Sequence, residues 1–135
     1  MIIIVDTNFL IYCSKYKIDL LSELSNIYPK YEVLVPQKVF NELQKLKKGH
    51  GKDNFAASLA LEMMKKMLDE KKMKIQGLSS KNADDEIVKL VEQLKEINKS
   101  EKIRVGTMDI KLSDKIKRLG AGILKIRQKK RISEE

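Results

Sequence analysis

Cysteine, histidine and tryptophan are almost missing from this chain of 135 residues, which has one Cys, one His and no Trp. The single Cys13 excludes an internal disulfide and a cysteine-rich zinc site, and it is typical of a protein in a reducing cytoplasm. The single His50, in a Gly- and Lys-rich loop, argues against a Ser-His-Asp triad. We therefore expect a cytoplasmic protein whose chemistry uses neither a thiol nor an imidazole.

Long hydrophobic runs and aromatic residues are also scarce. The first apolar run, Ile2–Val5, is interrupted by Asp6, so we expect no signal-peptide core or membrane-spanning helix there, and no membrane partner. Four Tyr and three Phe are too few for extensive stacking on nucleobases.

Charged residues are abundant instead. A total of 28 Lys and Arg against 19 Asp and Glu gives +9 at pH 7, which indicates a polyanionic partner, with nucleic acid first.

Short apolar segments alternate with amphipathic ones along the chain. Such alternation predicts a parallel sheet covered by helices on both faces. We expect one α/β domain of four to five strands over residues 1–126, followed by a basic C-terminal tail at 127–135. Strands are predicted at 1–5, 33–35, 103–105 and 122–126, with a short one at 74–76, and helices at 8–14, 19–28, 36–47, 54–72, 84–97 and 109–119.

Acidic residues follow the predicted strands. Asp6 comes directly after the first strand, and Asp109 follows the strand at 103–105 in Val-Gly-Thr-Met-Asp. Glu42 lies one to two turns into the helix after the second strand, and Asp84 and Asp85 begin a helix. In open parallel sheets, sites form beyond the carboxyl ends of the strands. Acids without histidine or cysteine suit a hard cation such as Mg²⁺ or Mn²⁺, which can act on a phosphodiester.

Each of these acids also has a structural interpretation. Asp84, Asp85 and Asp109 could cap helices, and Glu42 could lie on a solvated face. Asp6 is different, because it abuts a buried strand and there needs a partner or a metal. The next two residues, Thr7 and Asn8, could be turn and N-cap residues or could orient Asp6.

Four segments, taken together, resemble the PIN domain family. They are Val-Asp-Thr-Asn-Phe-Leu (5–10), Val-Phe-Asn-Glu-Leu (39–43), Asn-Ala-Asp-Asp-Glu-Ile (82–87) and Val-Gly-Thr-Met-Asp (105–109). Their order and spacing match the family over nearly the whole chain. The resemblance implies a three-layer α/β/α fold and a nuclease that cuts single-stranded RNA with Mg²⁺ or Mn²⁺ held by three or four acids.

The resemblance also assigns roles to individual residues. The four family acids, expected to be catalytic, would be Asp6, Glu42, Asp84 and Asp109, and Thr107 would be the supporting hydroxyl. One or two divalent ions would bind Asp6, Asp84 and Asp109, directly or through water. Glu42 would add a ligand or orient water, and Asp85 could share the role of Asp84.

Two subfamilies fit this pattern. One comprises the VapC-type toxin ribonucleases, and the other comprises archaeal PIN proteins that resemble the rRNA-processing nucleases of the small ribosomal subunit. The adjacent Asp84 and Asp85 and the basic ending favour the second. We therefore predict a metal-dependent endoribonuclease acting on single-stranded or loop RNA in rRNA processing, with a toxin or a catalytically idle RNA-binding module as alternatives. A phosphoacceptor receiver domain is disfavoured, because that fold needs an acid pair where Asp6 stands alone.

The expected partners follow from the same reasoning. RNA would contact the basic ending of the chain, at Lys125, Arg127, Lys129, Lys130 and Arg131. A second copy of the chain, an antitoxin or a ribosome-assembly partner are further candidates.

Overall fold

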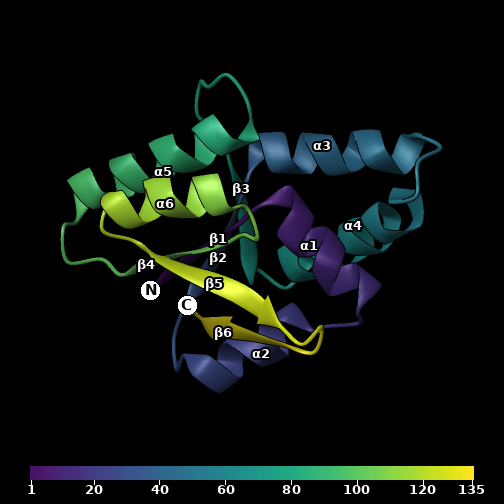
Figure 1. The fold of residues 1–135 in the computed structure, drawn as a ribbon, viewed down its shortest axis with the longest axis horizontal. Coiled ribbons are helices and arrows are strands. Elements are labelled where there is room, and N and C mark those ends of the chain that lie inside the picture. Colours follow the sequence, from purple (N-terminus) through teal and green to yellow (C-terminus); the bar gives the residue numbers. More distant parts are fainter.

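The computed structural model describes residues 1–135 and consists of a six-stranded sheet and six helices (Figure 1). The elements in chain order are β1 (Ile2–Val5), α1 (Thr7–Lys15), α2 (Leu20–Ile27), β2 (Glu32–Pro36), α3 (Gln37–Lys48), α4 (Asn54–Asp69), β3 (Met73–Gln76), α5 (Ala83–Ile97), β4 (Ile103–Gly106), α6 (Ile110–Arg118), β5 (Gly122–Arg127) and β6 (Arg131–Glu134). No helix is long and apolar enough to cross a bilayer.

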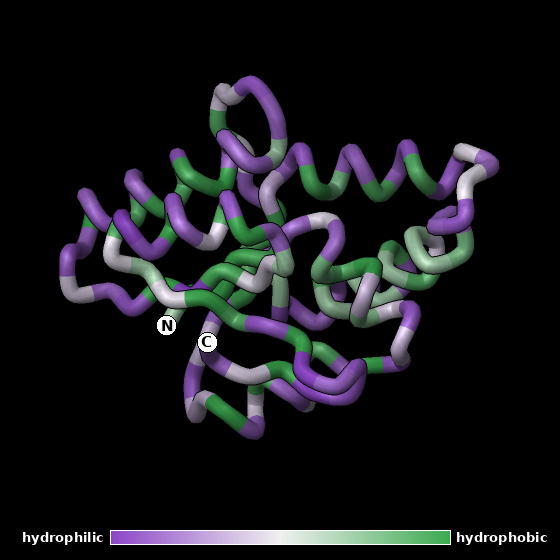
Figure 2. The backbone as a smooth tube through the Cα atoms, viewed as in Figure 1, coloured by the Kyte–Doolittle hydropathy of each residue, from purple (hydrophilic) through white to green (hydrophobic).

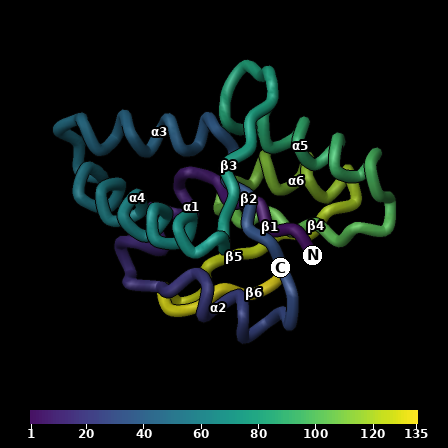
Figure 3. Tube along the Cα trace, turned by 180° about the vertical axis from the view of Figure 1, so that it is seen from behind, coloured from purple at the N-terminus to yellow at the C-terminus, as the bar shows by residue number.

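The strands lie in the order β3-β2-β1-β4-β5-β6, and all neighbours are parallel except β5 and β6. The chain builds outward from β1 to β2 and β3, and then crosses to β4 on the other side of β1. Because parallel crossovers are right-handed, this reversal puts α1–α4 on one face of the sheet and α5 and α6 on the other. The views from front and back agree with this layering (Figures 1 and 3). The predicted three-layer α/β/α fold is confirmed.

The core forms where the strands meet the apolar faces of the helices. Residues 3–5 of β1 are fully buried, as expected for a short run of β-branched residues at the centre of a parallel sheet. The apolar colour of the central strands and the polar colour of the outer helix faces follow this division (Figure 2). Phe9 of α1 packs against the end of β4, where a Cβ on Gly106 would lie 3.1 Å from its ring. A glycine at 106 therefore lets α1 start close to β4.

The sheet has one strand more than the four to five expected, because residues 131–134 form β6. This strand pairs antiparallel with β5, with Ile126 opposite Ile132. Ile132 is buried, and its backbone N–H donates to the Glu23 carboxylate of α2 at 2.9 Å. The basic residues at 127–131 are consequently part of a β-hairpin, not a free end.

Helix α4 ends three residues earlier than expected. Its pattern of apolar residues continues only to Leu68, and Lys71 then takes a left-handed conformation with φ of 59°. The turn leads directly into β3, which starts at Met73.

Candidate active site

Four of the five acids of the predicted site line one surface hollow of about 200 Å³. The hollow lies beyond the carboxyl ends of β1 and β4, at the point where the strand order reverses, which is the usual place for a site in an open α/β sheet. Its lining residues are Asp6, Thr7, Asn8, Glu42, Asn82, Ala83, Asp84 and Asp109.

Asp6 forms the floor of the hollow. It directly follows the paired ends of β1 and β4 and is only 7% exposed. One carboxylate oxygen caps α1 by accepting the Phe9 backbone N–H at 2.7 Å, and the other accepts the hydroxyl of Thr107. Burial raises the pKa of Asp6 to about 6, with smaller contributions from the charges of Asp84 and Asp109. The negative charge of the Asp6 carboxylate at the base of the hollow is therefore destabilised by burial, and a bound cation would stabilise it.

Thr107 connects the two acids that follow strands. Its fully buried hydroxyl donates to Asp6 and accepts the backbone N–H of Asp109 at 3.0 Å. The hydroxyl therefore fixes the relative positions of Asp6 and the first turn of α6.

We expect Thr107→Val to raise the pKa of Asp6 further, because the hydrogen bond from Thr107 lowers it in the native protein. The valine would also leave the Asp109 N–H without its acceptor, at a cost in unfolding free energy of about 1 to 3 kcal/mol. Carboxyl NMR titration of Asp6 and urea unfolding would measure both effects. Thr107→Ser keeps the hydroxyl and should leave the pKa of Asp6 close to that of the wild type. A rise in the Asp6 pKa as large as that in Thr107→Val would contradict this role.

The other three acids reach the hollow from three different helices. Glu42 of α3 accepts the Thr7 hydroxyl at 2.8 Å, which holds its carboxylate toward α1. Asp84 lies in the first turn of α5, where burial and the charge of Asp109 raise its pKa. Asp109 caps α6 through the Leu112 backbone N–H at 3.0 Å.

Asp85 does not line the hollow. Its carboxylate accepts the Lys81 backbone N–H at 2.9 Å and lies 3.4 Å from the Lys89 ammonium, and the first of these contacts is the main cause of its lowered pKa. A helix turns about 100° per residue, so adjacent residues cannot face the same hollow in the same way. The structure therefore brings Asp84 to the site and gives Asp85 a local role at the start of α5.

Glu86 is a buried residue beside the site that the sequence analysis missed. It is 1% exposed and accepts two backbone N–H groups, from Lys38 at 2.8 Å and from Leu78 at 3.0 Å. It thereby joins α5, which carries Asp84, to the start of α3, which carries Glu42. Glu86 directly follows Asp84 and Asp85 in the sequence, and nothing in this run of acids distinguishes it for such a role.

The hollow fits a hard cation by the chemistry of its donors. It offers four carboxylates and no Lys or Arg side chain in its lining, and the charges of Asp84 and Asp109 disfavour ionisation of Asp6. No three acidic, His or Cys side chains are close enough together to form a complete ligand set. Mg²⁺ commonly keeps several waters and uses only one or two carboxylates, so a partial set is compatible with such an ion.

Other candidate groups lie away from this hollow. Cys13 is buried, which raises the pKa of its thiol to about 12, and His50 lies exposed in the loop after α3.

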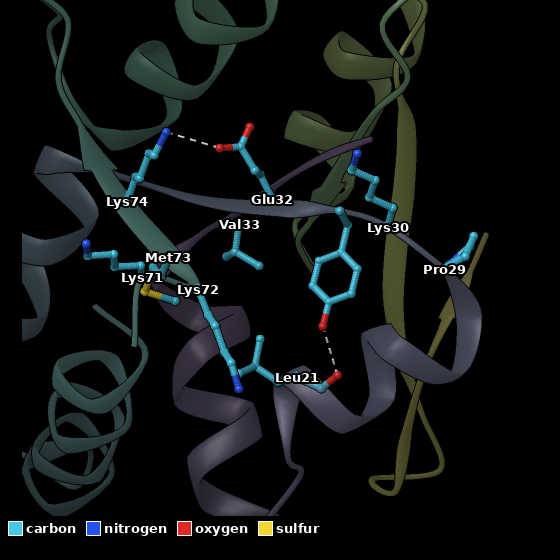
Figure 4. Close-up of a pocket in the computed structure, with 10 residues that line it drawn as sticks. Leu21, Pro29, Lys30, Glu32, Val33, Lys71, Lys72, Met73 and Lys74 are labelled. Atoms are coloured by element: carbon cyan, nitrogen blue, oxygen red, sulfur yellow. Dashed lines mark hydrogen bonds and ion pairs between the residues drawn. The ribbon is translucent and has the colours of Figure 1, made fainter. Parts of the chain in front are cut away.

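Another pocket, of about 340 Å³, lies at the amino ends of β2 and β3 (Figure 4). Its walls carry four lysines but only one acid, Glu32, which pairs with Lys74 at 3.1 Å. It therefore offers no cluster of carboxylates.

The basic residues predicted to contact RNA fall into two places. Lys125 is half-buried in β5, and its ammonium donates to Ser113 of α6 at 3.3 Å. The other four are exposed on the hairpin formed by the end of β5, the turn and the start of β6, at Arg127, Lys129, Lys130 and Arg131.

A parallel sheet that reverses its order beside β1, with an acid after β1 and another after β4, is the arrangement of a PIN-like domain. The family model described as "PIN like domain" matches residues 3–129, and the chain belongs to this family. Ribonuclease VapC4 of Methanocaldococcus jannaschii is 30% identical over 132 residues, which are 95% of this chain and 92% of that protein. Among solved structures, the PIN domain endonuclease Utp24 is similar with a TM-score of 0.77 and 30% identity, over 99% of this chain and 90% of that chain.

Proposed function

We propose that this protein is a metal-dependent endoribonuclease that hydrolyses phosphodiester bonds in single-stranded or loop RNA. The observation that carries the proposal is the hollow in which carboxylates from four separate elements meet without a basic side chain. Membership of the PIN-like family, and relatives named as a ribonuclease and an endonuclease, support it.

The carboxylates divide into three that would hold Mg²⁺ or Mn²⁺ and one that assists. Asp6, Asp84 and Asp109 would bind the ion directly or through water molecules, and Glu42 would add a ligand or orient a water molecule. When bound, such an ion lowers the pKa of water and offsets charge on the phosphate oxygens. Thr107 and Thr7 hold Asp6 and Glu42 in place through hydrogen bonds, and Asn8 borders the opening of the hollow.

The substrate class follows from charge. An acidic hollow in a protein with a formal charge of +9 can attract a phosphate chain to its surface and still bind cations at one point. Four exposed basic residues of the β5–β6 hairpin are the proposed contacts to the RNA backbone, with Lys125 beside α6 as a fifth.

Two biological roles remain as proposals. The likeness to the endonuclease Utp24 favours rRNA processing, with a ribosome-assembly partner, and the likeness to VapC4 favours a toxin ribonuclease with an antitoxin. Incubation of the protein with precursor rRNA and with unrelated messenger RNA separates them, because a processing enzyme cuts the precursor at a defined position.

We expect RNA cleavage with Mn²⁺ to stop in the presence of a chelator and to fall by at least about a hundredfold in Asp109→Asn, which removes one ligand charge. Asparagine still caps α6, so the variant should fold. Asp85→Asn is the matched control and should change the rate by less than about threefold, since Asp85 lies outside the hollow. Equal losses in both variants would contradict the assignment.

The idle RNA-binding module makes a different prediction. Calorimetric titration with Mn²⁺ would then give no binding at millimolar metal, while RNA affinity would persist. Binding of Mn²⁺ that disappears in Asp109→Asn supports the nuclease.

A further inference from the structure

One exposed face of α1 leads away from the hollow. Asn8, Tyr12 and Tyr16 recur every four residues, and residues with this spacing lie on one side of a helix. Asn8 lines the hollow, and Tyr16 caps the other end of α1 about 12 Å further along the axis. The opposite side of α1 is buried in the core, so a ligand can meet the helix only on its exposed side, which carries this face and Lys15.

The two tyrosines on this face form a pair. Their ring centroids are 5.6 Å apart with 32° between the planes, and Tyr12 is 37% exposed. Neither hydroxyl has a hydrogen-bond partner in the protein. By contrast, Tyr28 donates to Glu134, and Tyr31 donates to the Leu21 carbonyl at 3.0 Å. Tyr12 and Tyr16 are thus the two tyrosines whose hydroxyl groups form no hydrogen bond within the protein.

The basic hairpin adjoins the far end of this face. The Lys129 ammonium lies 5.2 Å from the centroid of the Tyr16 ring, a cation–π distance. Gln128 and Lys129 turn the hairpin with φ of 54° and 55°, an uncommon conformation for residues other than glycine. The turn thereby places the exposed Lys129 beside Tyr16. In Figure 1 the turn between β5 and β6 lies near the C-terminal end of α1.

We propose that the Tyr12 and Tyr16 face of α1, together with the β5–β6 turn, binds the single-stranded RNA on one side of the cleaved bond. Tyr12 stacks against a nucleobase, Tyr16 supports the Tyr12 ring from behind, and Lys129 contacts the phosphate backbone. This inference rests on the proposed function, because it gives the strand that enters the hollow a path across the surface. Such stacking tolerates any base, so it contributes affinity and register more than sequence preference.

Charge favours RNA over a second copy of the chain as the occupant of this face. Two copies, each with a formal charge of +9, would repel each other, and Lys129 would add a positive charge to both sides of the contact. A polyanion with flat aromatic bases matches both parts of the face, the rings and the positive charge.

The test measures binding without cleavage. Fluorescence anisotropy of fluorescein-labelled oligouridine and oligoadenosine, in a chelator, gives the Kd for the wild type and variants. We expect Tyr12→Ala to weaken both by roughly tenfold, Tyr12→Phe to stay within about twofold because it keeps a ring, and Ile97→Ala, at a more exposed apolar residue on α5, to change nothing. Because the chain has no Trp, quenching of tyrosine emission by RNA reports stacking directly, and Tyr12→Ala should reduce it.

The outcomes separate this proposal from the proposed function. In an active enzyme, Tyr12→Ala should raise KM and leave kcat unchanged. An unchanged Kd in Tyr12→Ala, or an equal loss in Tyr12→Phe, overturns the RNA path even if the wild type cleaves RNA. A Kd weakened only by Tyr12→Ala in a protein that cleaves nothing supports the path and overturns the nuclease. A change of sedimentation state with no change of Kd would make this face an interface between copies, and would also overturn the path.

Discussion

Asp6→Asn is expected to raise the free energy of unfolding by about 2 kcal/mol at pH 7 in a chelator, while RNA cleavage falls to background. The cause is the buried carboxylate, whose pKa of about 6 in the folded protein compares with 3.8 for an ordinary Asp. That pKa difference corresponds to about 3 kcal/mol of unfolding free energy. We expect a smaller gain because asparagine replaces the hydrogen bonds of the carboxylate imperfectly. The asparagine oxygen can still cap α1 at Phe9, and its amide can donate to Thr107. Urea unfolding of the two proteins measures the difference.

The gain in stability has a definite pH dependence. Because the pKa of Asp6 is higher in the folded protein than in the unfolded chain, the folded state binds the extra proton between about pH 4 and pH 6. Wild-type stability from this group is therefore fully present below pH 4 and is lost as the pH rises through 6. The asparagine variant does not titrate at this position. Its advantage should be absent near pH 4 and complete at pH 7, and an advantage of equal size at both pH values would contradict the argument.

Added Mg²⁺ or Mn²⁺ provides the second half of this experiment. A cation that binds only the folded wild type raises its Tm in proportion to the logarithm of its concentration. Millimolar metal should therefore reduce the difference between wild type and Asp6→Asn. Asp85→Asn is the control, because it should keep the wild-type response to metal. A response to metal that persists in Asp6→Asn would place the ion elsewhere.

The sequence predicts those parts of the site whose signal is local. Asp6 directly follows β1, and Asp109 lies three residues after β4. Because parallel strands end at a common edge, the proximity of the two acids can be predicted without coordinates. Asp84 and Asp85 are harder to separate, because both lie in the first turn of α5. Only the direction of each side chain decides, and the hydrogen bond from Lys81 turns Asp85 away from the hollow.

The features that the sequence did not predict depend on long-range packing. The turn before β6 contains Gln128 and Lys129 in place of the Asn-Gly or Asp-Gly expected for a tight hairpin, and Ile132 is the one buried residue of that strand. The exposure of Tyr12 was equally unpredicted, because an aromatic residue six positions after Asp6 is as compatible with the core as with the surface. In each case the neighbours that decide the outcome lie on other elements.

Glu86→Ala is expected to lower the free energy of unfolding by about 3 kcal/mol, because two buried backbone N–H groups would lose their acceptor. The side chain is 1% exposed, and the groups it accepts, from Lys38 and Leu78, belong to the start of α3 and the segment after β3. Urea unfolding at pH 7 measures the loss. Glu92→Ala, at an exposed position of the same helix, is the control and should change stability by less than about 0.5 kcal/mol.

Glu86→Gln tests whether this contact also positions the site. The amide oxygen can accept one of the two N–H groups, but the amide nitrogen would face the other as a second donor. Because Glu86 joins the helix of Asp84 to the helix of Glu42, the variant should bind Mn²⁺ about tenfold more weakly while remaining folded. Calorimetry with Mn²⁺ at a temperature well below the Tm of the variant measures this effect. Wild-type affinity in a destabilised Glu86→Gln would restrict the residue to stability, since the two acids would then keep their places without it.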